Sequence, residues 1–420
     1  MRTFGVLFLA VSLLAGCGGL PVGVAMARSD VPRAAADPAA AAEAARAINA
    51  FGLDLYRALL DSQPANGNLV ISPASIAIAL AMARAGTRGK TAAQMDAVLY
   101  GIGSAERAAA INALDQALSS RSGSFPANDG KSYSLSLRIA NAPFAQRDYE
   151  WQQAFLDALA ANFGAGLWLV DYRTDYEGAR HQINGWVDEQ TEQRIPELLA
   201  AGTLNALTRL VLVNAIYLKA PWLTPFVPES TQPAPFRLLD GSSVDVPTMR
   251  QQESLRHAAG NGWQAVELPY VGGALAMTII VPDDLAAFES TLDGDAFAAV
   301  VAGLAEREVA LSLPRFGTET KAELGDLLTA LGMPDAFDPN LADFSGMTSE
   351  ERLYIAAVIH QANIDVDEKG TEAAAATAVV MEATGMPMEP VTMRVDRPFL
   401  FAVRDTHTGA ILFLGRITEP

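Results

Sequence analysis

Cysteine is almost absent from this sequence: one residue, Cys17, occurs among 420. A chain with no second cysteine forms no internal disulfide, so we expect an oxidising compartment to add nothing to its stability. Half of the residues are hydrophobic, which is enough for a substantial core in one large domain or in two or three smaller ones.

Positive charge is also scarce. The 30 Lys and Arg residues are outnumbered by 48 Asp and Glu, the net charge is −18, and no basic run occurs anywhere. Nucleic-acid phosphates are bound by clustered Lys and Arg side chains, so this composition argues against nucleic acid as a partner.

The patterns that mark common catalytic and metal sites are missing. The histidines are isolated, without the spacing typical of metal ligands: His181, His257, His360 and His407. Neither a Gly-x-Ser-x-Gly nor a His-Glu-x-x-His motif occurs. Residues 86–91 invite a phosphate-loop interpretation, but Arg84 stands where that motif requires glycine. We therefore expect no enzyme activity, no metal and no cofactor.

The N-terminus has the pattern of an export signal. Arg2 supplies a positive start, and residues 4–14 form an apolar run of about eleven, whereas a bilayer-spanning helix needs about twenty. The run ends in Leu-Ala-Gly-Cys, which resembles a bacterial lipoprotein signal, so we expect lipidation of Cys17. The protein would then be exported and anchored at the bacterial cell envelope, with Gly18 favouring the outer membrane, or lie in the extracellular space. The alternative is an ordinary secretory signal cut after residues 25–27, with Cys17 incidental.

The rest of the chain is organised as a tether followed by one domain. Residues 18–42, rich in Gly, Pro and Ala, are typical of a flexible tether, and folded sequence is expected from Glu43 onward. Helices are expected near 43–60, 72–82, 91–99, 148–163, 178–200, 286–304 and 319–331. Strands are expected near 133–139, 209–219, 274–281, 308–316, 355–367, 398–405 and 410–417. No Pro/Gly-rich break divides 43–420, so the pattern predicts one α+β domain with large, mostly antiparallel sheets.

One segment near the C-terminus is unusually small and almost uncharged. Its alternate side chains sort into an uncharged face, with Thr371, Ala373, Ala375, Thr377, Val379 and Met381, and a face with Glu372, Ala374, Ala376, Ala378, Val380 and Glu382. Such a segment can lie in a sheet as an extra strand. Four consecutive alanines also suit a helix or a plain linker, so composition leaves these alternatives open.

Several longer motifs resemble those of one family. Residues 68–76, Asn-Leu-Val-Ile-Ser-Pro-Ala-Ser-Ile, are similar to a signature near the N-terminus of serpins. Further serpin landmarks are matched in the correct order by residues 214–222, 268–270, 313–316, 396–401 and 415–417. The resemblance covers about 43–420 and implies the serpin fold, with about nine helices around three mostly antiparallel β-sheets and an exposed reactive loop at about 368–393.

The resemblance gives the alanine-rich segment a role. It is similar to the hinge of inhibitory serpins, which precedes a loop that baits a protease and then inserts into the central sheet. The hinge residues are Glu368, Gly370, Thr371, Glu372, Ala373, Ala374, Ala375, Ala376 and Thr377. A charge or proline on the inward face would cost several kcal/mol, and this face carries neither. We expect a suicide-substrate inhibitor that traps the acyl-enzyme of a serine protease.

The identity of the protease depends on the cleaved bond. Family spacing puts this bond at Thr384–Gly385, with Glu382, Ala383 or Met386 as alternatives because the loop is a few residues longer than in common relatives. Thr384 would suit an elastase-like or subtilisin-like enzyme, and Met386 a chymotrypsin-like one. No Arg or Lys occurs between Gly370 and Met393, so a trypsin-like partner is disfavoured.

The resemblance also implies residues that control opening of the sheet. These are a polar cluster of Ser72, Ser75, Asn214 and His360, and Trp222 where insertion starts. The alternative is that they are unrelated polar residues and an aromatic in a large core. The alternative function is a non-inhibitory serpin-fold binding or structural protein that is cleaved without trapping a protease. In either case we expect a monomer.

Overall fold

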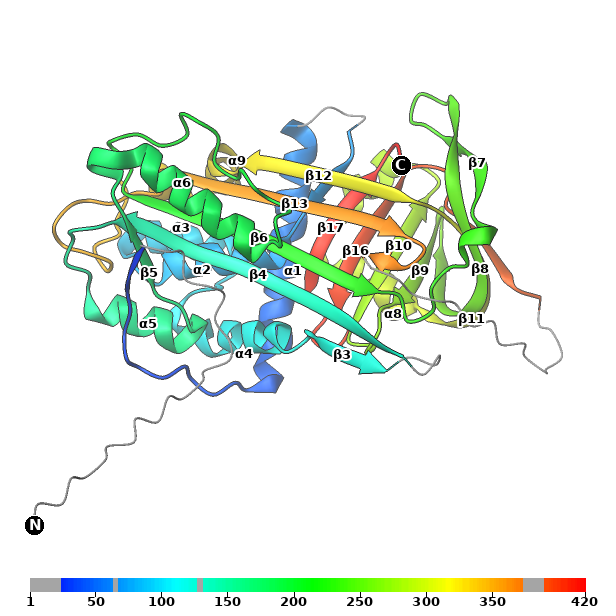
Figure 1. Ribbon diagram of the computed structural model, residues 1–420, viewed down its shortest axis with the longest axis horizontal. Helices are drawn as coiled ribbons and strands as arrows, with labels where there is room; N and C mark the ends of the chain where they lie inside the picture. Colours follow the sequence, from blue (N-terminus) through cyan, green and yellow to red (C-terminus); the bar gives the residue numbers. More distant parts are fainter. Residues whose placement is uncertain (1–23, 63–66, 127–130, 373–388) are drawn as a thin grey trace, which may run out of the picture.

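The computed structural model describes residues 24–62, 67–126, 131–372 and 389–420. Its nine α-helices within these residues are α1 Pro38–Ser62, α2 Pro73–Arg84, α3 Gly89–Val98, α4 Ala108–Ser119, α5 Gln153–Phe163, α6 Tyr172–Gln190, α7 Leu285–Thr291, α8 Gly294–Gly303 and α9 Gly325–Leu331. In Figure 1, α6 lies across the front of a long sheet, and α1 and α2 lie behind it. Among the described helices, none is long and apolar enough to cross a membrane.

The first sheet is the one that α6 covers. Its described strands run in the order β1 Ala25–Ala27, β5 Leu167–Val170, β4 Ser132–Gln146, β6 Leu210–Pro221, β14 Gly370–Thr371, β13 Ala357–Asp367 and β12 Phe316–Glu323, and β3 Gly123–Pro126 pairs with β4. Two long strands at its centre, β6 and β13, are parallel and pair directly over only part of their length. This partial pairing positions the site described below.

The second sheet packs at the other end of the molecule (Figure 1). Its described strands run in the order β15 Val391–Arg394, β11 Ala305–Pro314, β8 Ser243–Gly260, β9 Trp263–Pro269, β10 Leu275–Pro282, β16 Phe399–Asp405, β17 Ile411–Ile417 and β2 Leu69–Ile71, and β7 Gln232–Arg237 pairs with β8. Two of the three expected sheets are continuous with each other in the described residues, so these strands form two connected groups. The reason is β8, whose 18 residues pair with β9 near one end and with β7 and β11 over the rest.

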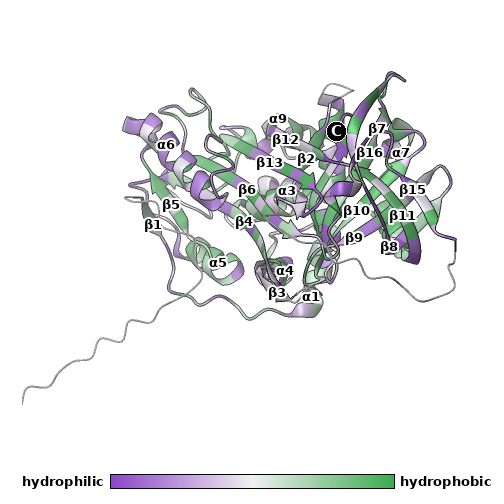
Figure 2. Ribbon diagram, turned by 45° about the vertical axis from the view of Figure 1, so that its right-hand side comes forward, coloured by the Kyte–Doolittle hydropathy of each residue, from purple (hydrophilic) through white to green (hydrophobic). Residues whose placement is uncertain are grey.

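Hydrophobic side chains fill both faces of the first sheet. Along β6, the even-numbered residues Leu210, Leu212, Ile216 and Leu218 join the main core between sheets and helices. The odd-numbered Val211, Val213 and Ala215 join a smaller core with residues of α6. Figure 2 shows the central strands mostly in green, whereas α6 carries purple, hydrophilic stretches on its outer side. A strand added beside β6 would therefore bury side chains on both faces.

Several predicted element boundaries were wrong. The helix expected at 178–200 ends at Gln190, because Glu192 and Gln193 have positive φ and Pro196 follows. The helix expected at 319–331 is a strand as far as Glu323, and only α9 is helical. The helix expected at 286–304 is broken by Asp293, whose side chain accepts a hydrogen bond from Ala296 N and caps α8.

The start of the helix expected at 91–99 was also wrong. Helix α3 begins at Gly89, so Thr91 lies inside it, and its Oγ1 accepts a hydrogen bond from Asp343 N at 3.0 Å. The start predicted for α2 is confirmed, because Ser72 Oγ accepts a hydrogen bond from Ser75 N and Pro73 occupies the first turn.

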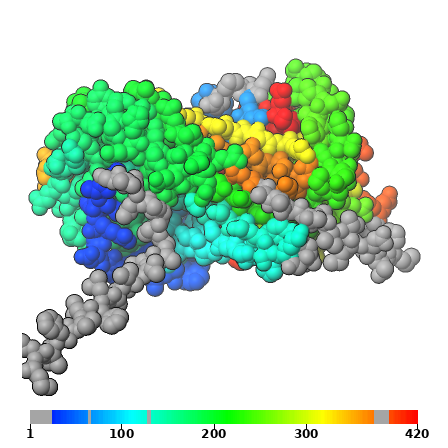
Figure 3. All heavy atoms as spheres, viewed as in Figure 1, coloured from blue at the N-terminus to red at the C-terminus, as the bar shows by residue number. Residues whose placement is uncertain are grey.

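The prediction of a flexible tether over 18–42 was wrong from residue 24 onward. Helix α1 begins at Pro38 rather than near Glu43, and Ala25–Ala27 form β1 at the edge of the first sheet. Between them, side chains and backbone contact α4 and α5. Figure 3 shows this segment in blue as a band along the surface at one end of the molecule. The alanine-rich composition indicated flexibility, but β5 offers an open strand edge that this segment covers.

Candidate functional site: the hinge and the opening of the sheet

The start of the hinge is held between the two central strands. After β13 the chain turns, and β14 lies antiparallel to β13 on one side and to β6 on the other. The two preceding carbonyls are also bonded: Lys369 O accepts from Trp222 N and Glu368 O from Phe226 N, each at 2.9 Å. The first residues of the hinge are therefore already part of the sheet.

Gly370 is required by this close approach. Its φ is +147°, and a Cβ at this position would lie 2.2 Å from Ala220 O and 2.7 Å from Pro221 Cα. Backbone atoms on β6 cannot move away as a flexible side chain could, so only glycine fits. The turn into the sheet depends on this residue.

Thr371 points into the core. Its side chain is 2% exposed, and its Oγ1 lies 2.6 Å from the hydroxyl of Tyr270. Tyr270 stacks on Trp222 with ring centroids 4.6 Å apart, and Trp222 Nε1 donates to Asp367 O at 2.9 Å. Burial raises the pKa of Tyr270 well above its usual value, so its hydroxyl stays neutral. Thr371 is thus buried beside two stacked aromatic rings.

Glu372 points to the opposite side. Its backbone N donates to Asp365 O at 3.1 Å, and its carboxylate forms an ion pair with Arg194, which also approaches Asp365. Its φ of +51° is a left-handed conformation that non-glycine residues rarely adopt. Thr371 and Glu372 thus face opposite ways, but β14 ends at Thr371 and Glu372 is not in the extended conformation that a period of two assumes.

Glu368 anchors the base of the hinge. Its side chain accepts hydrogen bonds from Arg315 at 2.8 Å and from Thr231 Oγ1. Burial alone would raise the pKa of Glu368, but these hydrogen bonds outweigh it and hold the pKa below its usual value. The carboxylate is therefore charged and paired where the loop leaves β13.

Directly ahead of the hinge, β6 and β13 stand apart. They pair only from Val211 to Ala215 and from Ala357 to Gln361. Beyond these five positions, a narrow cleft opens between them toward Thr371, lined by Ile216, Leu218, Ile364 and neighbouring residues. In Figure 1 the two strands run side by side toward the end where the hinge lies. The cleft holds only about 20 Å³, so a strand that continued from Thr371 would have to push β6 and β13 further apart.

The predicted polar cluster comes together under the paired part of these strands. His360 Nε2 accepts a hydrogen bond from Ser72 N at 3.1 Å, so its Nδ1 carries the proton and donates to Asn214 Oδ1 at 2.6 Å. Ser75 Oγ donates to Asn141 Oδ1 at 2.9 Å. The sequence had not indicated Asn141, and only the register reveals it, because it lies directly opposite Asn214.

His360 predicts a specific dependence of stability on pH. Burial lowers the pKa of His360 from 6.5 to about 3. Between these values the unfolded state binds a proton that the folded state does not, so the free energy of unfolding falls as the pH decreases from about 6.5 to about 3. The expected slope is about 1.4 kcal/mol per pH unit. Denaturant unfolding of the wild type and of His360→Gln at pH 7, 5.5 and 4.5 measures it.

The wild type and His360→Gln should differ in how steeply the free energy of unfolding changes with pH, and not only in its value at pH 7. His360→Gln should be less stable at pH 7 and should lose most of this pH dependence, whereas His407→Asn, at an exposed position, should keep it. Equal slopes for the wild type and His360→Gln would contradict a neutral buried imidazole.

Tyr270 and Arg194 are the other site residues whose roles the sequence did not indicate. Tyr270 belongs to the Leu-Pro-Tyr landmark, but its contact with Thr371 depends on the approach of β14. Arg194 lies in the irregular segment after α6, and no local pattern connects it with Glu372, which is 178 residues away. Some predicted site residues fall outside the described residues: Cys17, Ala373 to Thr377, and Glu382 to Met386.

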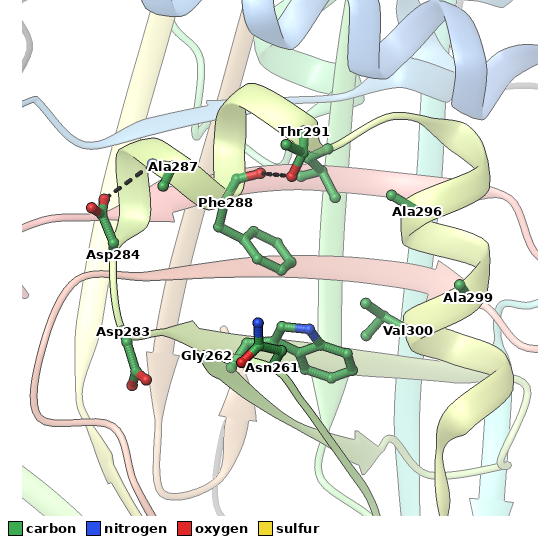
Figure 4. A pocket seen from close by; sticks show the side chains of 12 residues that line it. Asn261, Gly262, Asp283, Asp284, Ala287, Phe288, Thr291, Ala296, Ala299 and Val300 are labelled. Carbon is green, nitrogen blue, oxygen red and sulfur yellow. Dashed lines mark hydrogen bonds between the residues drawn. The ribbon is translucent and has the colours of Figure 1, made fainter.

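A separate hollow of about 520 Å³ lies between the β8–β9 turn, the start of α7 and α8 (Figure 4). Apolar side chains such as Phe288 and Val300 line it, and two carboxylates stand at its rim. Asp284 accepts a hydrogen bond from Ala287 N and caps α7, and Asp283 pairs with Arg397 at 2.8 Å. Both carboxylates are therefore engaged in contacts that stabilise the fold. Within the described residues, no group of His, Cys, Asp or Glu could hold a metal ion.

The fold and site define a protein in which a long loop begins as a short strand between the two central strands of the first sheet. The family model of serpins, described as serine protease inhibitors, matches residues 46–420, and the chain belongs to this family. Serpins are inhibitors rather than enzymes.

The relatives and solved structures agree with this assignment. Leukocyte elastase inhibitors of horse and human are each 38% identical over 383 residues, covering 88% of this chain and 97% of the relative. The pig protein is 40% identical over 382 residues with the same coverage. The native structure of tengpin, a thermophilic serpin, matches with a TM-score of 0.81 and 26% identity, covering 95% of this chain and 100% of the other. Uncleaved ovalbumin matches with a TM-score of 0.77 and 28% identity, covering 90% and 100%.

Proposed function

We propose that this protein inhibits a serine protease as a suicide substrate, by inserting its reactive loop between β6 and β13 while the enzyme is still acylated. The observation that carries the proposal is the position of β14. Thr371 is already paired with both strands, and ahead of it β6 and β13 are not paired with each other until Ala215 and Gln361. Cleavage would release the downstream end of the loop, so that the rest could follow.

The register of β14 predicts where each inserted residue would go. Thr371 pairs with Ala220, so the loop, continuing antiparallel to β6, would bring Thr377 opposite Asn214 and Met381 opposite Leu210. On its other side, Thr377 would meet His360. Thr371, Thr377 and the odd-numbered residues between them would point into the main core, which is the face without charge.

Insertion therefore has to separate the polar cluster. His360 and Asn214 now bond directly across the paired part of β6 and β13. Thr377 would enter between them, and its hydroxyl can both donate and accept, so neither partner need be left unsatisfied. This accounts for a threonine at the one inward position where an alanine would leave polar groups unpaired.

The target we propose is a serine protease with a small specificity pocket. Thr384 at the expected cleavage site is small, and the leukocyte elastase inhibitors among the relatives are named for such an enzyme. An elastase-like or subtilisin-like protease fits this position, and a chymotrypsin-like one would fit cleavage at Met386. The absence of Arg and Lys from the loop disfavours trypsin-like enzymes.

The location we propose is the bacterial cell envelope. The positive start, the apolar run of residues 4–14 and Leu-Ala-Gly-Cys at its end support lipidation of Cys17. The anchored domain would then meet proteases that reach the cell surface. Mass spectrometry of the N-terminal peptide tests the lipid directly.

Incubation with elastase-type and subtilisin-type proteases tests the inhibitory function. The expected product is a complex that survives SDS, with a mass near the sum of the two proteins less the released C-terminal peptide. Mass spectrometry of that peptide identifies the cleaved bond, with Gly385 expected at its N-terminus.

The alternative function gives a different result in the same experiment. A serpin-fold protein that does not inhibit would be cut in the loop and leave the protease active. Nicked serpin with undiminished protease activity for every enzyme tried would overturn the proposed inhibition. A Cys17→Ser chain serves as the control, because trapping in solution does not depend on the anchor.

A further inference from the structure

The N-terminal strand β1 leaves the domain at one defined end of the first sheet. Ala25 pairs with Leu169 and Ala27 with Leu167, so β1 runs antiparallel to β5. Strand β5 runs parallel to β4, whose last residues pair with the start of β6 at Leu210. The chain before Ala25 therefore emerges at the end of the sheet where β6 begins, which is the left end in Figure 1.

Loop insertion would bring the protease to this same end. The register places Met381 opposite Leu210, so Thr384, to which the enzyme is joined, would lie just beyond the start of β6. Strands β5, β4 and β6 separate β1 from the inserted loop, and at about 4.8 Å per strand the lateral distance is only about 19 Å. A protease domain of about 200 residues is about 40 Å across. The trapped enzyme and the N-terminal segment thus compete for the same space.

The length of the N-terminal segment makes this competition decisive for an anchored chain. Seven residue steps separate Cys17 from Val24, which span at most about 25 Å. While β1 is paired, a lipid at Cys17 would hold this end of the domain within about 25 Å of the bilayer. A body about 40 Å across does not fit in that space.

Release of β1 would remove the conflict. From Cys17 to the start of α1 at Pro38 there are 21 residue steps, or at most about 75 Å of extended chain. We propose that Val24 to Asp37 form a releasable strap, docked on β5 in the native protein and detached when a protease is trapped, so that the tether lengthens enough to admit the enzyme. This inference rests on the proposed trapping mechanism and on the anchor at Cys17.

The contacts of the strap suit release. It pairs over only three residues, and most of its side chains are exposed. Met26 lies against Gly166, where a Cβ would come within 2.7 Å of its sulfur. Ser29 Oγ donates to Asp157 of α5, and Arg33 Nε donates to Asn112 of α4 at 3.0 Å. Arg33 also pairs with Asp115, and the backbone of Ala34 bonds to α4 and α5. Release has to break these bonds, but the strap adds little buried apolar surface, and such a segment opens more readily than the sheet beside it.

A reversible lock on the strap tests the proposal. Ala25→Cys and Leu169→Cys sit directly opposite each other, at an antiparallel spacing that a disulfide can bridge. The lipidated double variant is reconstituted in phosphatidylcholine vesicles and mixed with the protease that the wild type traps. The oxidised protein should give at least tenfold less SDS-stable complex than the same protein after reduction. In a Cys17→Ser background without vesicles, the oxidised and reduced forms should trap equally.

A longer tether provides the matched rescue. Inserting 20 Gly and Ser residues between residues 18 and 24 adds up to about 70 Å of chain, so the oxidised anchored protein should regain trapping. Equal trapping by the oxidised and reduced anchored forms would overturn the strap proposal. Loss of trapping by the reduced Cys17→Ser form would instead overturn the proposed inhibitory function, and failure of the native chain to stay with the vesicles would overturn the anchor.

A second variant loosens the strap without cysteines. Gly166→Ala places a methyl group against Met26 and should weaken the pairing of β1 with β5. On vesicles this variant should trap the protease at least as fast as the wild type. Slower trapping, with the heat stability of the domain unchanged, would contradict release as the required step.

Discussion

A Thr371→Arg chain should be cut by its target protease and released, without forming the SDS-stable complex. Thr371 is the first inward residue of the hinge, almost fully buried against Tyr270 and paired with Ala220. An arginine there would have to leave water and enter the buried space beside Tyr270, which costs several kcal/mol. Insertion would slow, and water would deacylate the protease first.

The size of the effect follows from the competition between two rates. Each 1.4 kcal/mol added to the insertion barrier shifts the ratio of trapping to deacylation tenfold. The number of inhibitor molecules consumed for each protease inactivated should therefore rise at least tenfold, as measured by titration of residual protease activity.

The matched control lies one residue further along. Glu372 points to the outer side and pairs with Arg194, so Glu372→Gln should leave trapping within a few-fold of the wild type. If Thr371→Arg consumed no more inhibitor molecules per inactivated protease than the wild type, insertion through this end of the sheet would be contradicted.

Cleavage of the loop without a trapped protease should raise the melting temperature. The inserted segment would add about a dozen hydrogen bonds to β6 and β13, each contributing about 1 kcal/mol. A domain of this size has an unfolding entropy of about 0.8 kcal/mol/K, so about 12 kcal/mol corresponds to a rise of about 15 °C. The inserted side chains would also be buried against the cores on both faces of the first sheet, which would raise the melting temperature further.

Calorimetry of intact and loop-cleaved protein measures the difference. Cleavage should come from a protease that cuts the loop without being trapped, and Thr371→Arg cleaved in the same way is the control. Its melting temperature should rise much less, since its loop inserts poorly. If cleaved and intact wild-type protein had the same melting temperature, the loop would stay outside the sheet after cleavage.

Much of the fold could be predicted from the sequence because its signals are local. Ser72 and Pro73 start α2 through a cap and a fixed φ, and the strands at 398–405 and 410–417 are buried apolar runs. The errors arose where tertiary context decides. Residues 319–323 follow a period of two on an edge strand, and the alanines before α1 are held only because β5 leaves an edge open.

The hinge shows the same division between sequence and structure. Uncharged side chains at every second position are a property of the chain alone, and they determined that the segment could lie in a sheet. Family motifs indicated the members of the polar cluster, but not the hydrogen bonds by which His360 joins Ser72 to Asn214.

The sequence by itself determined which residues could enter the sheet, because charge, size and alternation are local properties. Only the tertiary structure decided where they would enter and what would meet them. The pairing of Thr371 with Ala220, the ion pair of Glu372 with Arg194 and the strap on β5 join residues more than 100 positions apart. Such contacts depend on strand register and on the packing of distant elements, which no local pattern specifies.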